Sequence, residues 1–317
     1  MHRVTENTRG MFVIAATPFA AGGAIDWPSV DTLVDFYLAE GVHGVTLLGV
    51  MGEAPKLSDQ ERLDLVQRVL ARVDGRVPVL VGVSDAGLDR LVQFATQCMD
   101  AGAAGVMVAG NRGQDTDEQV HGWFARVLER LGPDIPVCLQ DYPPTTGVHV
   151  SVDVVNRLID AHANLVLFKH EDLPGLAKLS RLRAGAGGGA RRRVGILVGN
   201  GGLYVPQELA RGADGIMTGF AFPGVLAEVW RRFAAGAADR AEDLYDLYLP
   251  LLRHEQQIGF GLALRKEVLR RRGAIACAAA RAPGPALSSR DVAELERLLA
   301  RLRAKLEAAG EPIPCGL

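Results

Sequence analysis

Leu165-Val166-Leu167-Phe168-Lys169-His170-Glu171-Asp172 is the stretch around which the rest of the chain is organised. Its four leading apolar residues predict a strand buried on both faces. Side chains alternate along a strand, so Lys169 and Glu171 share one face while His170 takes the other. An amine at the mouth of an apolar strand is poorly hydrated when charged, which favours the neutral nucleophile. Lys169 is therefore a candidate for imine formation with a carbonyl substrate; the alternative is a lysine that ends a strand and points into solvent.

The composition excludes several classes of protein. The chain has 317 residues and 48% hydrophobic content, enough for one long α/β domain or for two domains. A net charge of −2 gives no field for nucleic acid or an acidic membrane. The N-terminal residues 1–10 are polar, and no run approaches the roughly 20 apolar residues of a membrane span. We expect a cytoplasmic protein with four reduced thiols, Cys98, Cys138, Cys277 and Cys315.

Short apolar runs alternate with amphipathic segments along most of the chain. The runs predicted as strands are 11–16, 42–48, 78–83, 105–109, 135–140, 165–169, 194–198 and 214–217. The helices predicted between them are 28–40, one capped by Ser58 that ends near residue 73, 88–101, 117–131, one capped by Ser151, 173–182 and 206–211. Eight such units close most simply into a (β/α)₈ barrel. A doubly wound open sheet is the alternative, but no nucleotide fingerprint follows the first strand.

The last part of the chain has a different pattern. From about residue 222 it is nearly all helical, with predicted helices at 238–252, 259–271 and 289–307. We therefore divide the chain into a barrel domain, residues 1–221, and a C-terminal helical domain, residues 222–317, which could serve assembly. The glycine- and arginine-rich segment 185–193 is interpreted as a surface loop. It follows a helix and precedes a strand, the reverse of a phosphate-binding loop.

Active groups of such barrels gather at the C-terminal ends of the strands. Those ends hold Thr17, Gly49–Glu53, Ser84, Asn111, Gln140–Tyr142, Lys169, Glu171, Gly199–Asn200 and Met217–Thr218. The set suits carbonyl chemistry better than hydrolysis, because no Ser/His/Asp combination converges and no carboxylate pair stands alone. No histidines have metal-ligand spacing, so we expect no metal. The glycine-rich segment 199–202 is a candidate site for phosphate, a sugar-acid hydroxyl or a carboxylate.

Several motifs together resemble one known superfamily. They are Ala16-Thr17-Pro18-Phe19, Gly49-x-x-Gly52-Glu53 with Leu57-Ser58 and Glu61-Arg62, Lys169, Gly212-Ala213-Asp214-Gly215 and Arg281-x-Pro283. This order resembles the dihydrodipicolinate synthase/N-acetylneuraminate lyase superfamily over nearly the whole chain. The resemblance implies a (β/α)₈ barrel with a helical tail, a homo-oligomer (tetramer or dimer) and a small 2-oxo acid substrate. It also implies that Lys169 forms an imine with the C2 carbonyl and that no other cofactor is needed.

The departures from the superfamily pattern narrow the expected activity. Val50 and Met51 replace two threonines, and Gln140 replaces the strand-five tyrosine that relays protons. Thr145 stands in place of an arginine, and the tyrosine pair after strand four becomes Gly110 and Asn111. These changes disfavour the synthase and the sialic acid lyase. Gln140-Asp141-Tyr142-Pro143 and Lys169-His170-Glu171-Asp172 instead resemble the branch that dehydrates 2-keto-3-deoxy sugar acids, such as L-2-keto-3-deoxyarabonate.

We assign expected roles on this basis. Lys169 forms the imine, and Glu171 moves the C3 proton, directly or through a water that Gln140 helps to hold. Thr17 and the loop Gly49-Val50-Met51-Gly52 bind the C1 carboxylate by hydroxyl and backbone donors. Tyr142, Gly199, Asn200 and Met217 line the rest of the substrate site, with Tyr142 and Asp141 as alternative proton carriers. The competing interpretation of Glu171 is a structural salt bridge to an arginine.

Three other functions remain open from the sequence. The same imine could break the C3–C4 bond in a retro-aldol reaction that releases pyruvate. A deaminase acting on a cyclic imino acid is a second possibility. The third, from a different class, is a barrel that has lost catalysis and binds 2-oxo acids as a sensor.

Overall fold

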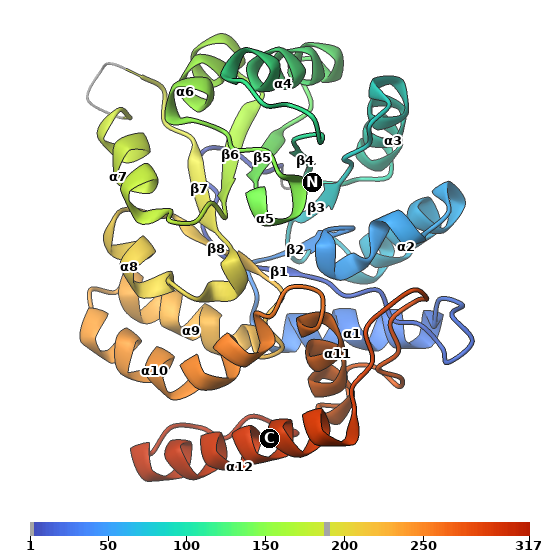
Figure 1. The fold of residues 1–317 in the computed structure, drawn as a ribbon, viewed down its shortest axis with the longest axis vertical. Helices are drawn as coiled ribbons and strands as arrows, with labels where there is room; N and C mark the ends of the chain where they lie inside the picture. Colours follow the sequence, from blue (N-terminus) through green and yellow to red (C-terminus); the bar gives the residue numbers. More distant parts are fainter. Residues whose placement is uncertain (1–2, 187–190) are drawn as a thin grey trace.

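A closed barrel of eight parallel strands forms the centre of the molecule (Figure 1). The computed structural model describes residues 3–186 and 191–317. Each strand pairs with the next in sequence, and β8 pairs with β1 to close the ring. The strands are β1 (Gly10–Ile14), β2 (Gly44–Leu47), β3 (Val79–Gly82), β4 (Gly105–Ala109), β5 (Val137–Asp141), β6 (Leu165–His170), β7 (Gly195–Val198) and β8 (Gly215–Thr218). The predicted (β/α)₈ barrel is confirmed.

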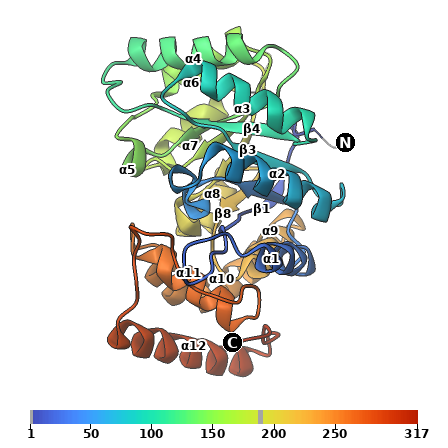
Figure 2. The same cartoon turned by 90° about the vertical axis from the view of Figure 1, so that its right-hand side faces the viewer.

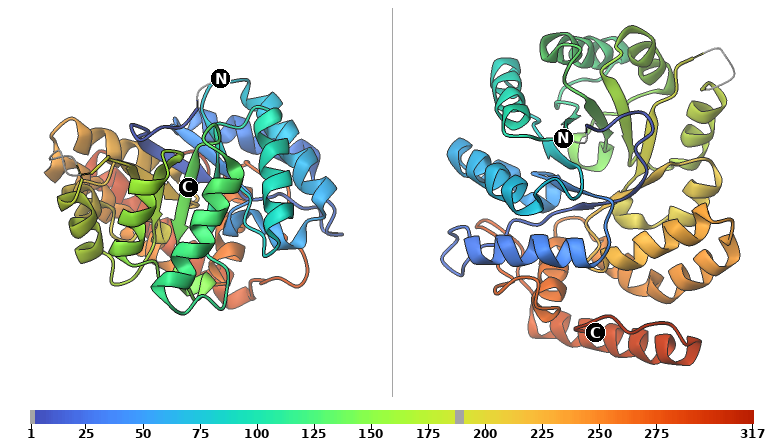
Figure 3. Two further views of the ribbon diagram at one scale, coloured as in Figure 1. Left: turned by 90° about the horizontal axis from the view of Figure 1, so that it is seen from above. Right: turned by 180° about the vertical axis from the view of Figure 1, so that it is seen from behind.

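Helices surround the strands on all sides (Figure 3). They are α1 (Trp27–Ala39), α2 (Asp59–Val73), α3 (Leu88–Asp100), α4 (Asp117–Leu131), α5 (Pro143–Thr146), α6 (Val152–Ala161), α7 (Leu176–Ala184), α8 (Val205–Ala210) and α9 (Pro223–Ala234). Side chains fix where several of them begin: Asp26 and Ser151 accept from backbone N–H groups, and Ser58 forms a capping box with Glu61. The helix predicted from residue 173 begins at Leu176 instead, because Pro174 disfavours helical backbone at Leu173.

The strands form the core because almost all of their residues are apolar and buried. The interior is filled by close packing rather than left as a pore. At Gly44, for example, an added Cβ would lie 2.2 Å from a ring carbon of Phe12, so glycine makes room for this large side chain. Cys98 and Cys138 are buried, and all four cysteines are free.

The C-terminal helices pack together at one end of the molecule (Figures 1 and 2). These are α10 (Ala238–Glu255), α11 (Gly261–Arg271) and α12 (Ser289–Ala309). Helix α10 contacts α9, α11 and α12, while α9 itself packs against β1 and β8. The division after residue 221 stays a prediction, because α9 contacts both the barrel and the appendage. Within the described residues no helix is long and apolar enough to cross a membrane. Residues 187–190 of the predicted surface loop lie outside the described residues.

Candidate active site

The centre of the candidate site is an ion pair between Lys169 and Glu171. Lys169 lies on β6 and is 2% exposed, and Glu171 follows the end of the same strand and is 5% exposed. The Lys169 Nζ lies 2.8 Å from Oε2 of Glu171. The two side chains therefore share a face, as strand alternation predicts. The alternative given in the sequence analysis, a lysine that points into solvent, is therefore wrong.

Neighbouring strands hold the Glu171 carboxylate from two further directions. Gln140 lies next to Lys169 in the β5–β6 register, and its Nε2 donates to Oε2 of Glu171 at 2.7 Å. The backbone N–H of Asn200 donates to Oε1 at 3.3 Å. A Cβ at Gly199 would lie 2.2 Å from that same oxygen, so this position has room only for glycine. The structure thus brings together five of the predicted site residues.

The alternation that turns Gln140 toward Glu171 turns Asp141 away from it. Asp141 is fully buried, forms an ion pair with Lys178 and accepts from the backbone N–H of Val150. His170 lies on the same side, where its Nδ1 is 3.9 Å from Asp141. Asp141 is thus a poor candidate for a proton carrier, because its contacts lie on the opposite side of the strands from Lys169.

The loop after β2 forms a second part of the site. Thr17 donates its hydroxyl to the carbonyl of Gly52 at 2.7 Å, and residues Val50–Gly52 form a 3₁₀ turn (η1). The Met51 side chain is buried, whereas Val50 is 56% exposed. The Val50 side chain is therefore directed toward solvent, and Thr17 uses its proton to fix the loop.

Two of the predicted substrate-binding residues have different environments. Tyr142 precedes the short helix α5 and is partly buried. Burial and the negative charge of Glu171 raise the pKa of its phenol, while the positive charge of Arg265 acts in the opposite direction. Met217 is fully buried within β8, next to Phe12 in register. Tyr142 is thus within electrostatic reach of Glu171, and Met217 is a core side chain of the barrel.

An arginine that the sequence analysis did not select also belongs to this region. Arg265 comes from α11 in the helical appendage, and its side chain is 12% exposed. Its Nη1 lies 3.4 Å from Sδ of Met51, and its Nη2 donates to Oε1 of Gln256 at 2.6 Å. Burial lowers the pKa of Arg265, and the charges of Glu255, Tyr142 and Glu171 oppose that shift. The spacing of residues along α11 does not show which part of the barrel Arg265 contacts, so its place at the site follows only from the tertiary fold.

Two buried acids beside the site were also missed. Burial, with a further contribution from Glu171, raises the pKa of Glu208 to about 8. Burial raises the pKa of Glu255 to about 7, against the opposing charge of Arg265. The side-chain nitrogen of Asn200 is buried and has no hydrogen-bond partner among the described residues. Unused polar atoms of this kind point to a site completed by water or by a ligand.

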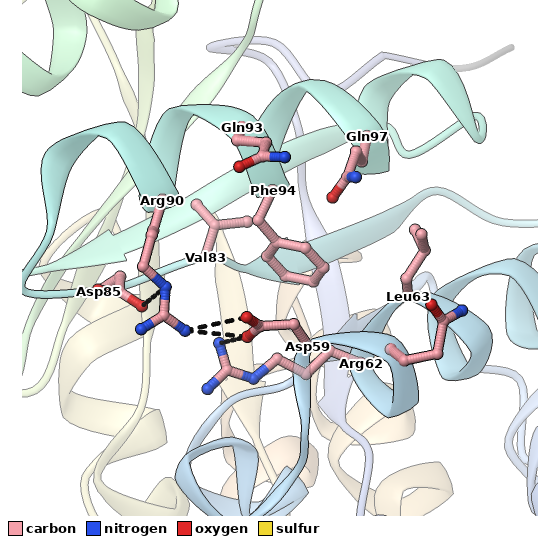
Figure 4. A pocket seen from close by; sticks show the side chains of 10 residues that line it. Asp59, Arg62, Leu63, Val83, Asp85, Arg90, Gln93, Phe94 and Gln97 are labelled. Atoms are coloured by element: carbon pink, nitrogen blue, oxygen red, sulfur yellow. Dashed lines mark hydrogen bonds and ion pairs between the residues drawn. The ribbon is translucent and has the colours of Figure 1, made fainter.

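A separate cleft lies on the outside of the barrel between α2 and α3 (Figure 4). It has a volume of about 150 Å³, and Lys169 is not among its lining residues. Its charged groups pair with one another: Asp59 lies 3.0 Å from Arg90 and 3.7 Å from Arg62. The cleft therefore does not contribute to the lysine site. No group of three or more potential metal ligands occurs among the residues that the structure describes.

The fold and the site together define a class of protein: a (β/α)₈ barrel with a buried lysine–glutamate pair at the C-terminal ends of its strands. Residues 7–302 match the model of the dihydrodipicolinate synthetase family. The chain belongs to this family, whose members are class I lyases. The predicted superfamily is confirmed.

The relatives of this chain within the family include a dehydratase and several synthases. The chain is 31% identical to L-2-keto-3-deoxyarabonate dehydratase of Azospirillum brasilense over 302 residues, covering 94% of this chain and 96% of the relative. It is 28% identical to 4-hydroxy-tetrahydrodipicolinate synthase of Pseudomonas putida over 76% of this chain and 81% of the relative. The crystal structure of dihydrodipicolinate synthase from Rhodopseudomonas palustris is similar with a TM-score of 0.92 and 43% identity, covering 95% of this chain and all of that one.

Proposed function

We propose that the protein is a dehydratase that forms an imine between Lys169 and a 2-keto-3-deoxy sugar acid, such as L-2-keto-3-deoxyarabonate. The observation that carries the proposal is the buried Lys169–Glu171 pair, with Gln140 bonded to the same carboxylate oxygen. The similarity to the Azospirillum dehydratase over 94% of the chain supports the substrate class. The predicted oligomer, tetramer or dimer, stays a prediction.

The Lys169–Glu171 pair supplies both the amine and the base that imine formation needs. An ammonium cannot attack a carbonyl, so a base must first take its proton. Glu171 is 2.8 Å from the Lys169 nitrogen, within reach for a direct transfer. The neutral amine then adds to the C2 ketone, and loss of water gives the iminium. Glu171 can return its proton to the departing hydroxyl in that step.

The same carboxylate can then carry the dehydration. The iminium withdraws electrons, so a C3 proton becomes acidic and Glu171 removes it to leave a neutral enamine. The enamine expels the C4 hydroxyl, which takes the proton back and leaves as water. Hydrolysis frees Lys169, and the unsaturated product rearranges to an oxo acid semialdehyde with no loss of carbon.

Gln140 favours this reaction over one that needs a phenol on β5. An amide donates hydrogen bonds but does not ionise, so Gln140 orients Glu171 without relaying protons. Proton transfer then falls to Glu171, the ionisable group paired with Lys169. A dehydratase that uses one carboxylate twice is consistent with this arrangement.

Trapping and product analysis test the proposal together. Borohydride reduction in the presence of pyruvate or L-2-keto-3-deoxyarabonate should add the reduced ligand to Lys169, detected by peptide mass spectrometry. Lys169→Ala should be neither labelled nor active. The sugar acid should yield a semialdehyde that retains every carbon. Release of pyruvate and an aldehyde would identify an aldolase instead, and release of ammonia from an imino acid would identify a deaminase.

A synthase is the second candidate, because 43% identity links the chain to a structure of that name. Its condensation would start from the same Lys169 imine with pyruvate. Turnover of pyruvate with an aldehyde partner, without dehydration of any 2-keto-3-deoxy acid, would favour it. Pyruvate that stabilises the fold without a trappable adduct would indicate a binding protein that has lost catalysis.

A further inference from the structure

We propose that Arg265, from the helical appendage, binds the C1 carboxylate of the 2-oxo acid and supplies the positive charge that the Gly49–Gly52 loop lacks. The inference deepens the proposed function and rests on it. It concerns which group of this chain recognises the acid, a role that the sequence analysis gave to the loop and Thr17 alone.

The loop has few donors left for a carboxylate. The side chains of Val50 and Met51 carry no hydrogen-bond donors. The hydroxyl of Thr17 is used by the carbonyl of Gly52. The N–H of Gly52 donates to Gly49, and that of Glu53 donates to Val50. The N–H groups of Val50 and Met51 have no hydrogen-bond partner among the described residues, so the loop offers two uncharged donors. These backbone donors carry no net charge, so a carboxylate at this loop is stabilised further by a cationic donor beside it, because desolvating an anion without a strong partner is costly.

Arg265 has donors that the protein uses poorly. Its Nη1 contacts only the thioether sulfur of Met51 among the described residues, and a thioether is a weak acceptor. Its Nε is buried without a hydrogen bond, although Oε2 of Glu255 lies 3.4 Å away. A guanidinium forms its best bonds with a carboxylate, where two parallel N–H groups meet two oxygens. The Nη1 group, which has this weak acceptor alone, lies at the Met51 side chain of the loop.

The next residue of α11 fixes the arginine at this place. Lys266 is fully buried, and its Nζ lies 2.5 Å from Oε1 of Glu53. Glu53 also pairs with Lys56 at 2.8 Å and accepts from the backbone N–H of Arg281. Consecutive residues of one helix therefore hold Glu53 and touch Met51, so the position of Arg265 relative to the loop is set by a buried ion pair.

Pyruvate and its neutral amide, pyruvamide, separate this role from others, because they share the C2 ketone but differ in charge at C1. We expect Arg265→Met to raise the pyruvate concentration for half-maximal borohydride trapping by roughly 10- to 100-fold, the effect of losing a charge-assisted hydrogen bond. The value for pyruvamide should change less than about 2-fold. Arg270→Met is the matched control, since Arg270 lies on the same helix and pairs with Glu267.

Two results would overturn the assignment. Unchanged pyruvate trapping in Arg265→Met, with weaker binding of the sugar acid alone, would move Arg265 to the distal end of the substrate. Equal weakening for pyruvate and pyruvamide would indicate a structural role. If Arg265→Met does not fold, Arg265→Lys carries the test, and it must weaken pyruvate but not pyruvamide by several-fold.

Measurements on the wild-type protein distinguish failure of the proposed imine chemistry from failure of the role proposed for Arg265. Absence of any trapped adduct would remove the imine and leave carboxylate binding to be measured by the rise in melting temperature with pyruvate. That rise should be lost in Arg265→Met and kept in Arg270→Met. A rise of equal size in all three proteins would refute the role of Arg265.

Discussion

Glu171→Gln tests the chemistry of the site with the smallest change of shape. The substitution keeps the length and planarity of the side chain but removes its ability to carry a proton. The carboxylate is held by the Lys169 ion pair at 2.8 Å, by Gln140 at 2.7 Å and by the backbone N–H of Asn200 at 3.3 Å. An amide oxygen turned toward Lys169 and Gln140 preserves the two shorter contacts. The amide nitrogen then faces the N–H of Asn200, which is the longest of the three.

The expected magnitudes follow from this geometry. Two donors facing each other near Asn200 cost roughly 1–2 kcal/mol of folding free energy. Loss of the charge paired with the buried Lys169 costs about 3–5 kcal/mol more while the lysine is charged, so a melting curve of the variant accompanies the assay. General acid–base catalysis contributes about 10²- to 10⁴-fold to a rate. Glu171 acts in both proton transfers of the proposed dehydration, so turnover should fall by about 10³-fold or more. Imine formation at Lys169 should survive, because buffer or water can accept the amine's proton over a longer incubation.

The assay compares two readouts on the same samples. Semialdehyde formation measures turnover, and the borohydride adduct with pyruvate measures the imine. Asp172→Asn is the matched control: it removes the next carboxylate in the chain, whose contacts are Lys178 and His149. The control should keep turnover within about 3-fold, because the ion pair that it removes does not include Lys169. Equal loss of adduct and turnover in Glu171→Gln would show that Glu171 only positions Lys169, and unchanged turnover would exclude it as the proton carrier.

Three further variants probe the surroundings of the pair. Gly199→Ala places a methyl group 2.2 Å from Oε1 of Glu171, so the carboxylate must move, and turnover should fall at least 10-fold with little change in melting temperature. Glu208 has a pKa raised to about 8 from the ordinary 4.5, so folding favours its protonated form and stability declines as pH rises between these values. Glu208→Gln should remove that decline, which amounts to at most about 3.5 kcal/mol between urea titrations at pH 5 and at pH 8. A slope that is the same in both proteins would show that Glu208 does not titrate in this range. Lys266→Met leaves the buried Glu53 with one ion-pair partner fewer and should lower the unfolding free energy by about 3 kcal/mol, whereas a loss below about 1 kcal/mol would contradict the role of this pair as an anchor.

Much of the fold could be predicted from local patterns in the sequence. Strands buried on both faces appear as unbroken apolar runs, and eight of them at regular intervals leave few closed topologies. Helix starts at Asp26, Ser58 and Ser151 were predictable because a side-chain oxygen must satisfy the free N–H groups of the first turn. The alternation of side chains along β6 likewise predicted that Lys169 and Glu171 lie on the same face, as the structure shows.

Other parts of the site could not be read in this way, because no local rule contains them. Arg265 follows the barrel by many residues, and its contact with Met51 depends on how α11 packs against the loop after β2. The direction of Asp141 was open until the β5–β6 register paired Gln140 with Lys169. The buried acid Glu208 sits on a short helix of mixed composition, where sequence alone does not distinguish a buried from an exposed glutamate.

Burial of the lysine–glutamate pair also gives the proposed proton transfer a direction. Before the transfer, the site holds a positive iminium at Lys169 beside a negative Glu171; afterwards it holds a neutral enamine and a neutral acid. Both residues are at most 5% exposed, so water screens neither charge and the low-dielectric surroundings disfavour the separated pair. Gln140 opposes this trend, because its amide N–H donates a stronger hydrogen bond to the charged carboxylate than to the neutral acid. A neutral amide on β5 therefore lets one carboxylate serve as base while its partner is charged and as acid once that charge is gone.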